Sequence, residues 1–223
     1  MPIKNTLKLY VENGFYHIYN RGVDRREIFY SPEDCSVFLY YLKIYLSSPS
    51  TLLRGDDLSP AMLYKIYNLN LFEEVDLLSF ALMPNHFHLQ VKQKSKTSIQ
   101  KLMRRVLTGY AQYFNKKYKR VGTLFESTYK AVLTTTEPQH IYLSSYIHQN
   151  PMKLKHPKFD FIEFSSYPYY LHKRQAEWVK PGEILSFFSS KVDNQFLSYK
   201  SFVENLDHQY DSVLSGLILE DIV

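Results

Sequence analysis

The sequence predicts an α+β fold in which a ferredoxin-like split βαβ antiparallel sheet has helices on one face and is followed by a C-terminal helical extension. Segments with strand-like and helix-like spacing of apolar residues follow one another in the order strand, helix, two strands, helix, strand, helix. The chain has 223 residues, 45% of them apolar, which is enough to bury one sizeable core. We therefore expect one main domain over residues 1–152 and an extension over residues 153–223.

The first strand and the first helix have clear local signals. The run FYHIY at residues 15–19 is aromatic and β-branched and leads into NRG, which is typical of a strand followed by a turn. Ser31 then stands at the N-cap of a helix, with Pro32 at the first helical position and apolar residues at helical spacing behind it. Residues 48–70 are rich in turn formers, so we expect a connecting segment with one short helix near 61–67.

The remaining elements of the main domain follow in close succession. The apolar stretch 75–91 is interrupted by a Pro-Asn pair, which predicts a hairpin whose second strand is HFHLQV. A helix is expected over 98–118, where apolar residues on one face are opposed by basic residues on the other. A strand over 129–134 then precedes a helix that begins near 137 and ends at the next Asn-Pro pair, at 150.

The composition argues against several classes of protein. Cys35 is the single cysteine, so it cannot form an internal disulfide, and we expect it to be a buried small residue. No stretch approaches the roughly 20 apolar residues that span a bilayer, and the first residues lack the apolar core of a signal peptide. We therefore expect a soluble, intracellular protein without a membrane partner. A net charge of +5 with 20 tyrosines and 15 phenylalanines favours nucleic acid as the partner.

Two histidines lie one residue apart in the second strand of the predicted hairpin. Side chains at positions i and i+2 of a strand point to the same face, so His86 and His88 are able to share one divalent metal ion. For an isolated H-x-H tripeptide, the alternative explanation is a pair of histidines on the open face of a sheet. Two ligands also do not complete a metal site, so a third must come from elsewhere in the chain.

The later helix offers that third ligand and a nucleophile. In SSYIHQNP, Tyr146 and Asn150 lie four residues apart and share one helix face. The amide oxygen of Asn150 would complete a set of two imidazoles and one amide, with open positions for water and phosphate, which suits Mg²⁺ or Mn²⁺. The phenol of Tyr146, with an ordinary pKa of about 10, would need activation by the metal and by a nearby base.

Three other side chains each have two interpretations. His17, on the strand expected to neighbour HFHLQV, either supports the metal ligands or belongs to the core. Glu126 is either a carboxylate behind the site or a structural residue. His148 points about 200° around the helix from Tyr146, so we expect it to be structural or to contact DNA.

Basic residues gather in the turn after the first strand and on the second long helix with its exit. The predicted DNA contacts are Arg21, Arg25, Arg26, Arg104, Arg105, Lys116 and Arg120. Phosphate contacts from such residues would make binding sensitive to salt. The nearby Tyr110, Tyr113 and Tyr118 either stack on bases or are buried behind a solvated helix face.

Five motifs together resemble the HUH single-tyrosine transposases, most closely the REP-associated tyrosine transposases. In chain order they are YHIYNRGVDRREIF, HFH after MPN, MRRVLTGYAQYFNKKYKRVGTLFE, YIHQNP and FSSY. The resemblance covers nearly the whole chain.

This resemblance implies a metal-dependent transposase or endonuclease that cleaves and rejoins single-stranded DNA near hairpins or palindromic repeats. His86 and His88 would hold the metal, and Tyr146 would attack the scissile phosphate to give a 5′-phosphotyrosine link and a free 3′-hydroxyl. Insertion-sequence relatives carry a glutamine as third ligand where this chain has Asn150, as in the REP-associated branch. Such a protein is expected in the prokaryotic cytoplasm, associated with the nucleoid, as a monomer or a homodimer.

Two alternatives remain open. One is a domesticated hairpin-binding protein that no longer cuts DNA, and the other is an HUH replication or relaxase initiator. The complete set of two histidines, a tyrosine and an asparagine favours a nuclease over a pure binder. The position of the tyrosine helix well downstream of the histidines resembles the transposase branch more than the initiators.

Overall fold

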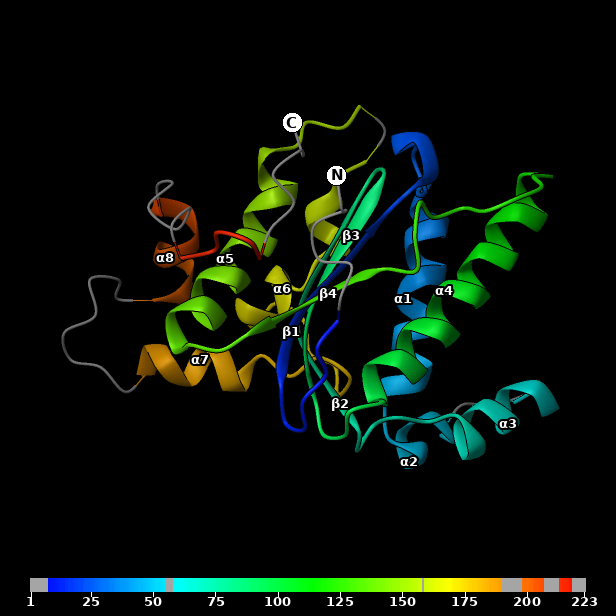
Figure 1. The fold of residues 1–223 in the computed structure, drawn as a ribbon, viewed down its shortest axis with the longest axis horizontal. Helices are drawn as coiled ribbons and strands as arrows, with labels where there is room; N and C mark the ends of the chain where they lie inside the picture. Colours follow the sequence, from blue (N-terminus) through cyan, green and yellow to red (C-terminus); the bar gives the residue numbers. More distant parts are fainter. Residues whose placement is uncertain (1–7, 55–57, 158, 190–197, 207–212, 218–223) are drawn as a thin grey trace.

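The fold is a four-stranded antiparallel sheet with helices on both faces, seen here in a computed structural model (Figure 1). The described residues are 8–54, 58–157, 159–189, 198–206 and 213–217. The strands are β1 (Phe15–Arg21), β2 (Val75–Met83), β3 (His86–Gln93) and β4 (Lys130–Thr134). Their order in the sheet, β2-β3-β1-β4, confirms the predicted ferredoxin-like topology. Within the described residues, no helix is both long and apolar enough to span a bilayer.

One face of the sheet packs against α1 (Pro32–Leu46) and α4 (Ser98–Lys117), the two helices of the ferredoxin-like unit. Side chains alternate along each strand, so Ile18 and Phe87 enter this core while their neighbours enter the other face. α1 begins with a capping box between Ser31 and Asp34. The buried Asp34 carboxylate also accepts hydrogen bonds from the hydroxyls of two tyrosines on and after α4. These bonds hold the two helices together.

Three tyrosines that the sequence offered as possible base-stacking residues belong to this packing. Tyr110 is fully buried and its hydroxyl donates to the main-chain oxygen of Ile28. Tyr113 and Tyr118 donate to Asp34 at 3.0 and 2.7 Å. Their hydroxyl groups are thus engaged within the protein, in agreement with the structural interpretation.

The opposite face of the sheet is covered by α5 and by the C-terminal helices, so the expectation of helices on one face is wrong for the whole chain (Figure 1). The helices of this layer are α5 (Glu137–Lys153), α6 (Tyr167–Tyr170), α7 (Gly182–Ser189) and α8 (Tyr199–Asn205). Leu143 and Ile147 of α5 form a second hydrophobic core with Phe202 and Leu214. α5 covers this face because its apolar residues need a partner that the first core, on the far side of the sheet, cannot provide.

Shorter elements connect these layers. α2 (Pro49–Leu52) and α3 (Pro60–Asn68) lie in the segment where one short helix was expected. 3-10 turns follow β1 at Val23–Arg25 and precede α6 at Phe161–Phe164. α5 continues beyond the predicted end at Asn-Pro to Lys153, with Pro151 buried inside the helix. Tertiary packing of this last turn overrides the local preference for a helix end before proline.

A buried polar network joins α5 to the C-terminal extension. The His148 ring lies 2.7 Å from the hydroxyl of Tyr199 through Nδ1 and 2.6 Å from Oγ of Ser166 through Nε2. Ser166 in turn donates to the main-chain oxygen of Phe80 in β2. Burial lowers the pKa of His148 from 6.5 to about 3, so the ring is neutral in the folded protein. His148 is therefore structural, one of its two predicted roles.

Acid should destabilise the protein through His148. Below about pH 6.5 the unfolded chain binds a proton at this side chain that the folded protein does not bind until about pH 3, so the free energy of unfolding should fall as pH drops through this window. This group should contribute a loss of about 2 kcal/mol between about pH 8 and pH 5. Urea unfolding of the wild type and of His148→Gln at both pH values measures the difference.

The exposed His172 supplies the matched control. His172→Gln should keep the wild-type dependence on pH, whereas His148→Gln should have a shallower one whatever its stability at pH 8. Equal pH dependence in all three proteins would show that His148 is not neutral and buried.

Candidate functional site

The strand register brings the two histidines of HFH next to the first strand, on the face that α5 covers. In the antiparallel pair of β1 and β3, His88 is opposite Tyr19 and His86 is opposite Arg21. Residues directly opposite each other share a face, so His86 and His88 point to the same side while Phe87 enters the core beneath α1 and α4. Both histidines are buried, with exposed fractions of 2% and 0%.

A hydrogen-bonded chain determines which nitrogen of His88 carries its proton. Nδ1 of His17 lies 2.6 Å from the main-chain oxygen of Leu217, which can only accept, so this nitrogen donates. Because the His17 ring is neutral, its Nε2 has a lone pair, and this atom lies 2.9 Å from Nδ1 of His88. Nδ1 of His88 therefore donates to His17, and Nε2 of His88 retains a free lone pair.

The turn between β2 and β3 determines which ring nitrogen of His86 carries the proton. Its Nδ1 lies 2.6 Å from Oδ1 of Asn85, whose amide nitrogen donates to the main-chain oxygen of Arg25 at 3.1 Å. That second bond identifies Oδ1 as the acceptor, so Nδ1 of His86 donates and Nε2 has the lone pair. The loop after β1 approaches this turn closely, because the amide of Gly22 donates to the main-chain oxygen of Asn85 at 2.8 Å.

Nε2 of His86 and Nε2 of His88 are both buried and have no hydrogen-bond partner among the described residues. Burial lowers the pKa of His86 to about 3 and that of His17 to about 4, and it lowers the pKa of His88 well below its usual value. Nearby basic groups add to this effect, Arg21 at His86 and His86 at His88. The rings are therefore neutral, the state in which imidazole binds a metal ion.

Tyr146 lies beside these histidines and Asn150 lies one helical turn further along α5. The Tyr146 ring packs edge-on to His88, with 5.5 Å between ring centroids, and to His17, with 6.2 Å. The amide nitrogen of Asn150 donates to the main-chain oxygen of Tyr146 at 2.8 Å. Each nitrogen of the His86 and His88 rings is either bonded elsewhere or without a partner, so no hydrogen bond joins Asn150 to the pair. In the described part of the chain there is no cluster of three or more His, Cys, Asp or Glu side chains arranged for a metal.

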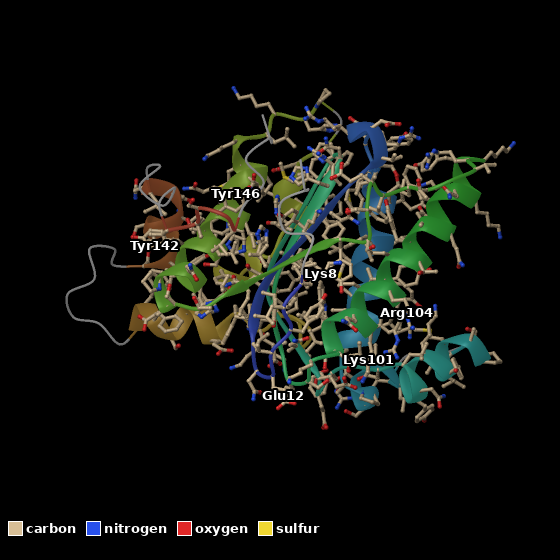
Figure 2. All side chains as sticks on the ribbon, viewed as in Figure 1. Lys8, Glu12, Lys101, Arg104, Tyr142 and Tyr146 are labelled. Atoms are coloured by element: carbon tan, nitrogen blue, oxygen red, sulfur yellow. The ribbon has the colours of Figure 1, made fainter. Side chains whose placement is uncertain are left out.

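The predicted basic residues fall into two groups on different faces of the sheet. Arg21 is opposite His86 in the strand register and forms an ion pair with Glu126 at 3.1 Å. Glu126 is therefore connected to the edge of the site through Arg21. Arg104 lies on α4, across the sheet from Tyr146 (Figure 2). Three of the other predicted basic residues have partners within the protein: Arg26 contacts Asp24 at 3.2 Å, Arg105 the main-chain oxygen of Leu69 at 2.7 Å, and Arg120 the side chain of Asn115 at 3.0 Å. Arg25, Arg104 and Lys116 are exposed.

Two groups of the site were not identified from the sequence. Asn85 was interpreted only as part of a turn, although an amide next to a metal-binding histidine is a possible hydrogen-bond partner for its ring. The main-chain oxygen of Leu217 has no sequence signal, because any residue supplies the same atom. His17, which had two predicted roles, contacts His88 directly.

Comparisons with known proteins agree with the motif resemblance. Residues 49–150, slightly less than half of the 223 residues, match the family model described as transposase, IS200 like. This matched segment includes His86, His88, Tyr146 and Asn150. A solved structure described as a REP-associated tyrosine transposase bound to a REP hairpin is similar with a TM-score of 0.47 and 9% identity, covering 82% of this chain and 93% of that chain. No curated protein matches the chain.

The hydrogen bonds predict that His17, His86 and His88 all carry their proton on Nδ1 at neutral pH. Long-range ¹H–¹⁵N correlation spectra of the metal-free protein distinguish the two nitrogens of each ring. The exposed His172 serves as a control and should not show the same fixed pattern. A proton on Nε2 of His88 would contradict the series of hydrogen bonds from Leu217 through His17 to His88.

Proposed function

We propose that this chain, which carries an IS200-like transposase segment at residues 49–150, is a metal-dependent transposase and endonuclease for single-stranded DNA. It would cleave and rejoin DNA near hairpins or palindromic repeats through a 5′-phosphotyrosine intermediate. One observation supports this most directly: two neutral, buried imidazoles with free Nε2 atoms lie beside the phenol of Tyr146. A protein that only bound DNA would have no need for this arrangement.

His86 and His88 would hold Mg²⁺ or Mn²⁺ through Nε2, with the amide oxygen of Asn150 as a third ligand. The two unpartnered nitrogens fit this role, because burying an uncompensated polar atom has a cost that a bound metal removes. When bound, such an ion supplies Lewis-acid chemistry, drawing charge from a phosphate oxygen. The present hydrogen bond of Asn150 to the main chain of Tyr146 uses the amide nitrogen and does not occupy the amide oxygen.

Tyr146 would carry out the covalent step of the reaction. Tyr146 would attack the scissile phosphorus, so that a bond forms between its phenolic oxygen and phosphorus while the bond to the 3′ oxygen breaks. Tyr146 loses its proton and the 3′ oxygen gains one, which leaves a 5′-phosphotyrosine and a free 3′-hydroxyl. Attack of a 3′-hydroxyl on the same phosphorus reverses these changes and rejoins the strands.

The partner in this proposal is single-stranded DNA with a hairpin or palindromic repeat, and the place of action is the prokaryotic nucleoid. Arg21 stands closest to the histidines among the predicted DNA contacts, opposite His86 in the sheet. Its pairing with Glu126 would orient the guanidinium for contact with a phosphate. Whether the active protein is a monomer or a homodimer determines whether Tyr146 acts with the histidines of its own chain or of a second copy.

Tyr146→Phe should abolish covalent attachment to DNA and leave DNA binding unchanged, because only the attacking oxygen is removed. The substrate is a labelled library of single-stranded oligonucleotides with a stem-loop and randomised flanks, incubated with Mn²⁺. A denaturing gel then measures protein that carries label. Tyr142→Phe, one turn earlier on α5 (Figure 2), is the matched control and should form adduct like the wild type.

The outcomes of this experiment separate the competing functions. Adduct in the Tyr146→Phe protein would exclude Tyr146 as the nucleophile. Tight binding without adduct in the wild type would identify a hairpin-binding protein that does not cut.

His86→Ala and His88→Ala should each weaken Mn²⁺ binding by more than the roughly 10- to 100-fold loss that is typical of removing a supporting hydrogen bond. Calorimetric titration of the DNA-free protein with Mn²⁺ measures the affinity without reference to activity. The control is His172→Ala, at an exposed position. Mn²⁺ binding of wild-type strength in His86→Ala would be incompatible with the proposed ligands.

A further inference from the structure

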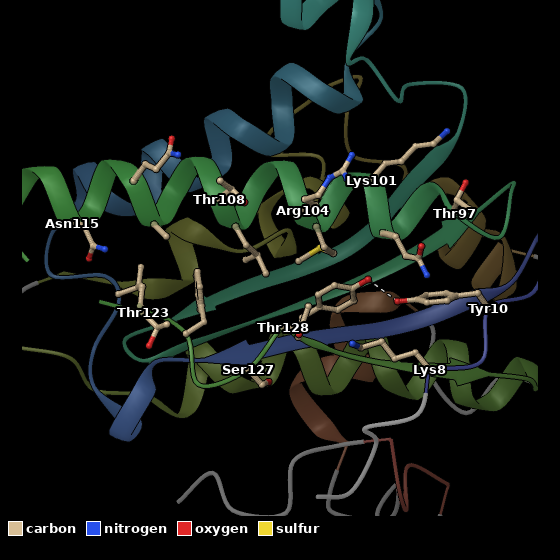
Figure 3. A pocket seen from close by; sticks show the side chains of 18 residues that line it. Lys8, Tyr10, Thr97, Lys101, Arg104, Thr108, Asn115, Thr123, Ser127 and Thr128 are labelled. Atoms are coloured by element: carbon tan, nitrogen blue, oxygen red, sulfur yellow. Dashed lines mark hydrogen bonds between the residues drawn. The ribbon is translucent and has the colours of Figure 1, made fainter. Parts of the chain in front are cut away.

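We propose that a groove on the α4 side of the sheet holds unpaired nucleotides of the DNA strand on which the histidine site acts. This inference rests on the proposed function and adds a second DNA-binding surface to it. The groove lies between α4 and the segment 123–129 that leads into β4, and Lys8 and Tyr10 close one end (Figure 3). Its volume of about 950 Å³ is at the upper end of the range for ligand sites, about 300–1,000 Å³.

The groove is left open by the way the helices cover the sheet. α4 packs against α1, and the described chain places no further helix over the groove between α4 and the β4 edge (Figure 1). The face of α4 that turns toward this edge has apolar side chains at helical spacing, Met103 and Leu107, and Phe125 and Tyr129 form the facing wall. Both walls of the groove are anchored elsewhere, α4 by the bonds of Tyr113 and Tyr118 to Asp34 and the segment 123–129 by the bridge between Phe125 and Gly22.

Aromatic and amide groups in the groove suit nucleobases. Tyr10 and Tyr129 are joined by a 2.6 Å hydrogen bond between their hydroxyls, which fixes both rings (Figure 3). Tyr129 is buried, so the partly exposed Tyr10 ring is the one that can serve as a stacking platform for bases of any sequence. The exposed amides of Gln100 and Gln112 line the same groove, where they can reach base edges.

The charges in the groove match a polyanion. Lys8, Lys101 and Arg104 line it, and no Asp or Glu is among its lining residues. Lys101 is paired with Glu74 at 2.8 Å, and the Lys8 ammonium lies 4.5 Å from the centre of the Tyr129 ring. Arg104 is exposed and forms no ion pair within the described ranges of the chain, so its guanidinium is available to a phosphate. This charge pattern favours a nucleic acid strand over an apolar peptide.

A short stretch of chain connects the groove to the histidine site. Phe125 forms a bridge with Gly22, and the next amide, that of Glu126, donates to the main-chain oxygen of Arg21 at 2.9 Å. Phe125 lines the groove, whereas the Glu126 side chain pairs with Arg21 opposite His86. The groove and the site thus share one wall, the extended segment of the protein at residues 125–126. DNA that leaves the groove over this edge arrives at the histidines.

Blocking the groove should weaken DNA binding without touching the site. Thr108→Trp fills the groove from an exposed position on α4, and Arg104→Ala removes its unpaired cation. Both are made in a Tyr146→Phe background and tested in EDTA, with the stem-loop library and fluorescence anisotropy as readout. We expect binding about tenfold weaker or more, equal to the loss of one stacked base or one phosphate contact.

The controls are Ser36→Trp and Lys43→Ala, exposed positions on α1 outside the groove, which should bind DNA like the parent. Equal binding by Thr108→Trp and the parent overturns the groove proposal alone, because adduct formation by Tyr146 is measured separately. Loss of self-association in Thr108→Trp with DNA binding intact would also overturn it, by identifying the groove as a contact between copies. Photo-crosslinks from 4-thiothymidine DNA to Phe125 or Tyr129 would support it, and crosslinks confined to α5 would count against it.

Discussion

Two imidazole nitrogens held in the interior without partners are the constraint around which this protein is arranged. An unsatisfied buried polar atom costs about 1–3 kcal/mol, so the Nε2 atoms of His86 and His88 do not improve the stability of the metal-free protein. The surrounding fold keeps them in place by occupying each Nδ1 instead, with Asn85 for one ring and His17 for the other. The same bonds leave the lone pair of each ring on Nε2, and the His88 ring lies beside Tyr146.

The two faces of the sheet differ in the kind of side chains they carry and in what those side chains contact. The face under α1 and α4 is an apolar core whose polar links, such as those of Asp34, serve to hold helices together. The face under α5 contains polar and aromatic groups that are positioned by hydrogen bonds. Leu217, the last residue of the described chain, reaches across 200 positions of sequence to orient His17. The C-terminal extension is therefore coupled to the candidate site both through this bond and through the His148 network.

The segment between α4 and β4 connects the proposed DNA surfaces. Phe125 contributes to the groove, while the next residue, Glu126, contributes to the edge of the histidine site through its pair with Arg21. A basic helix and a proposed metal-binding pair on opposite faces would otherwise be difficult to reconcile with one DNA substrate. A strand that bends over this edge would contact both, with Arg21 between them.

Short-range spacing was sufficient to predict the elements and the candidate residues. A period of two placed His86 and His88 on one face, and a separation of four placed Tyr146 and Asn150 on one side of a helix. The partners of these residues were not predictable in this way. The bond from Leu217 to His17, the position of Arg105 against Leu69 and the covering of the second face all depend on residues distant in the chain meeting through packing. Local periodicity carries no information about contacts between distant residues. The candidate ligands could therefore be predicted from the amino acids alone, whereas their orientation required the folded chain.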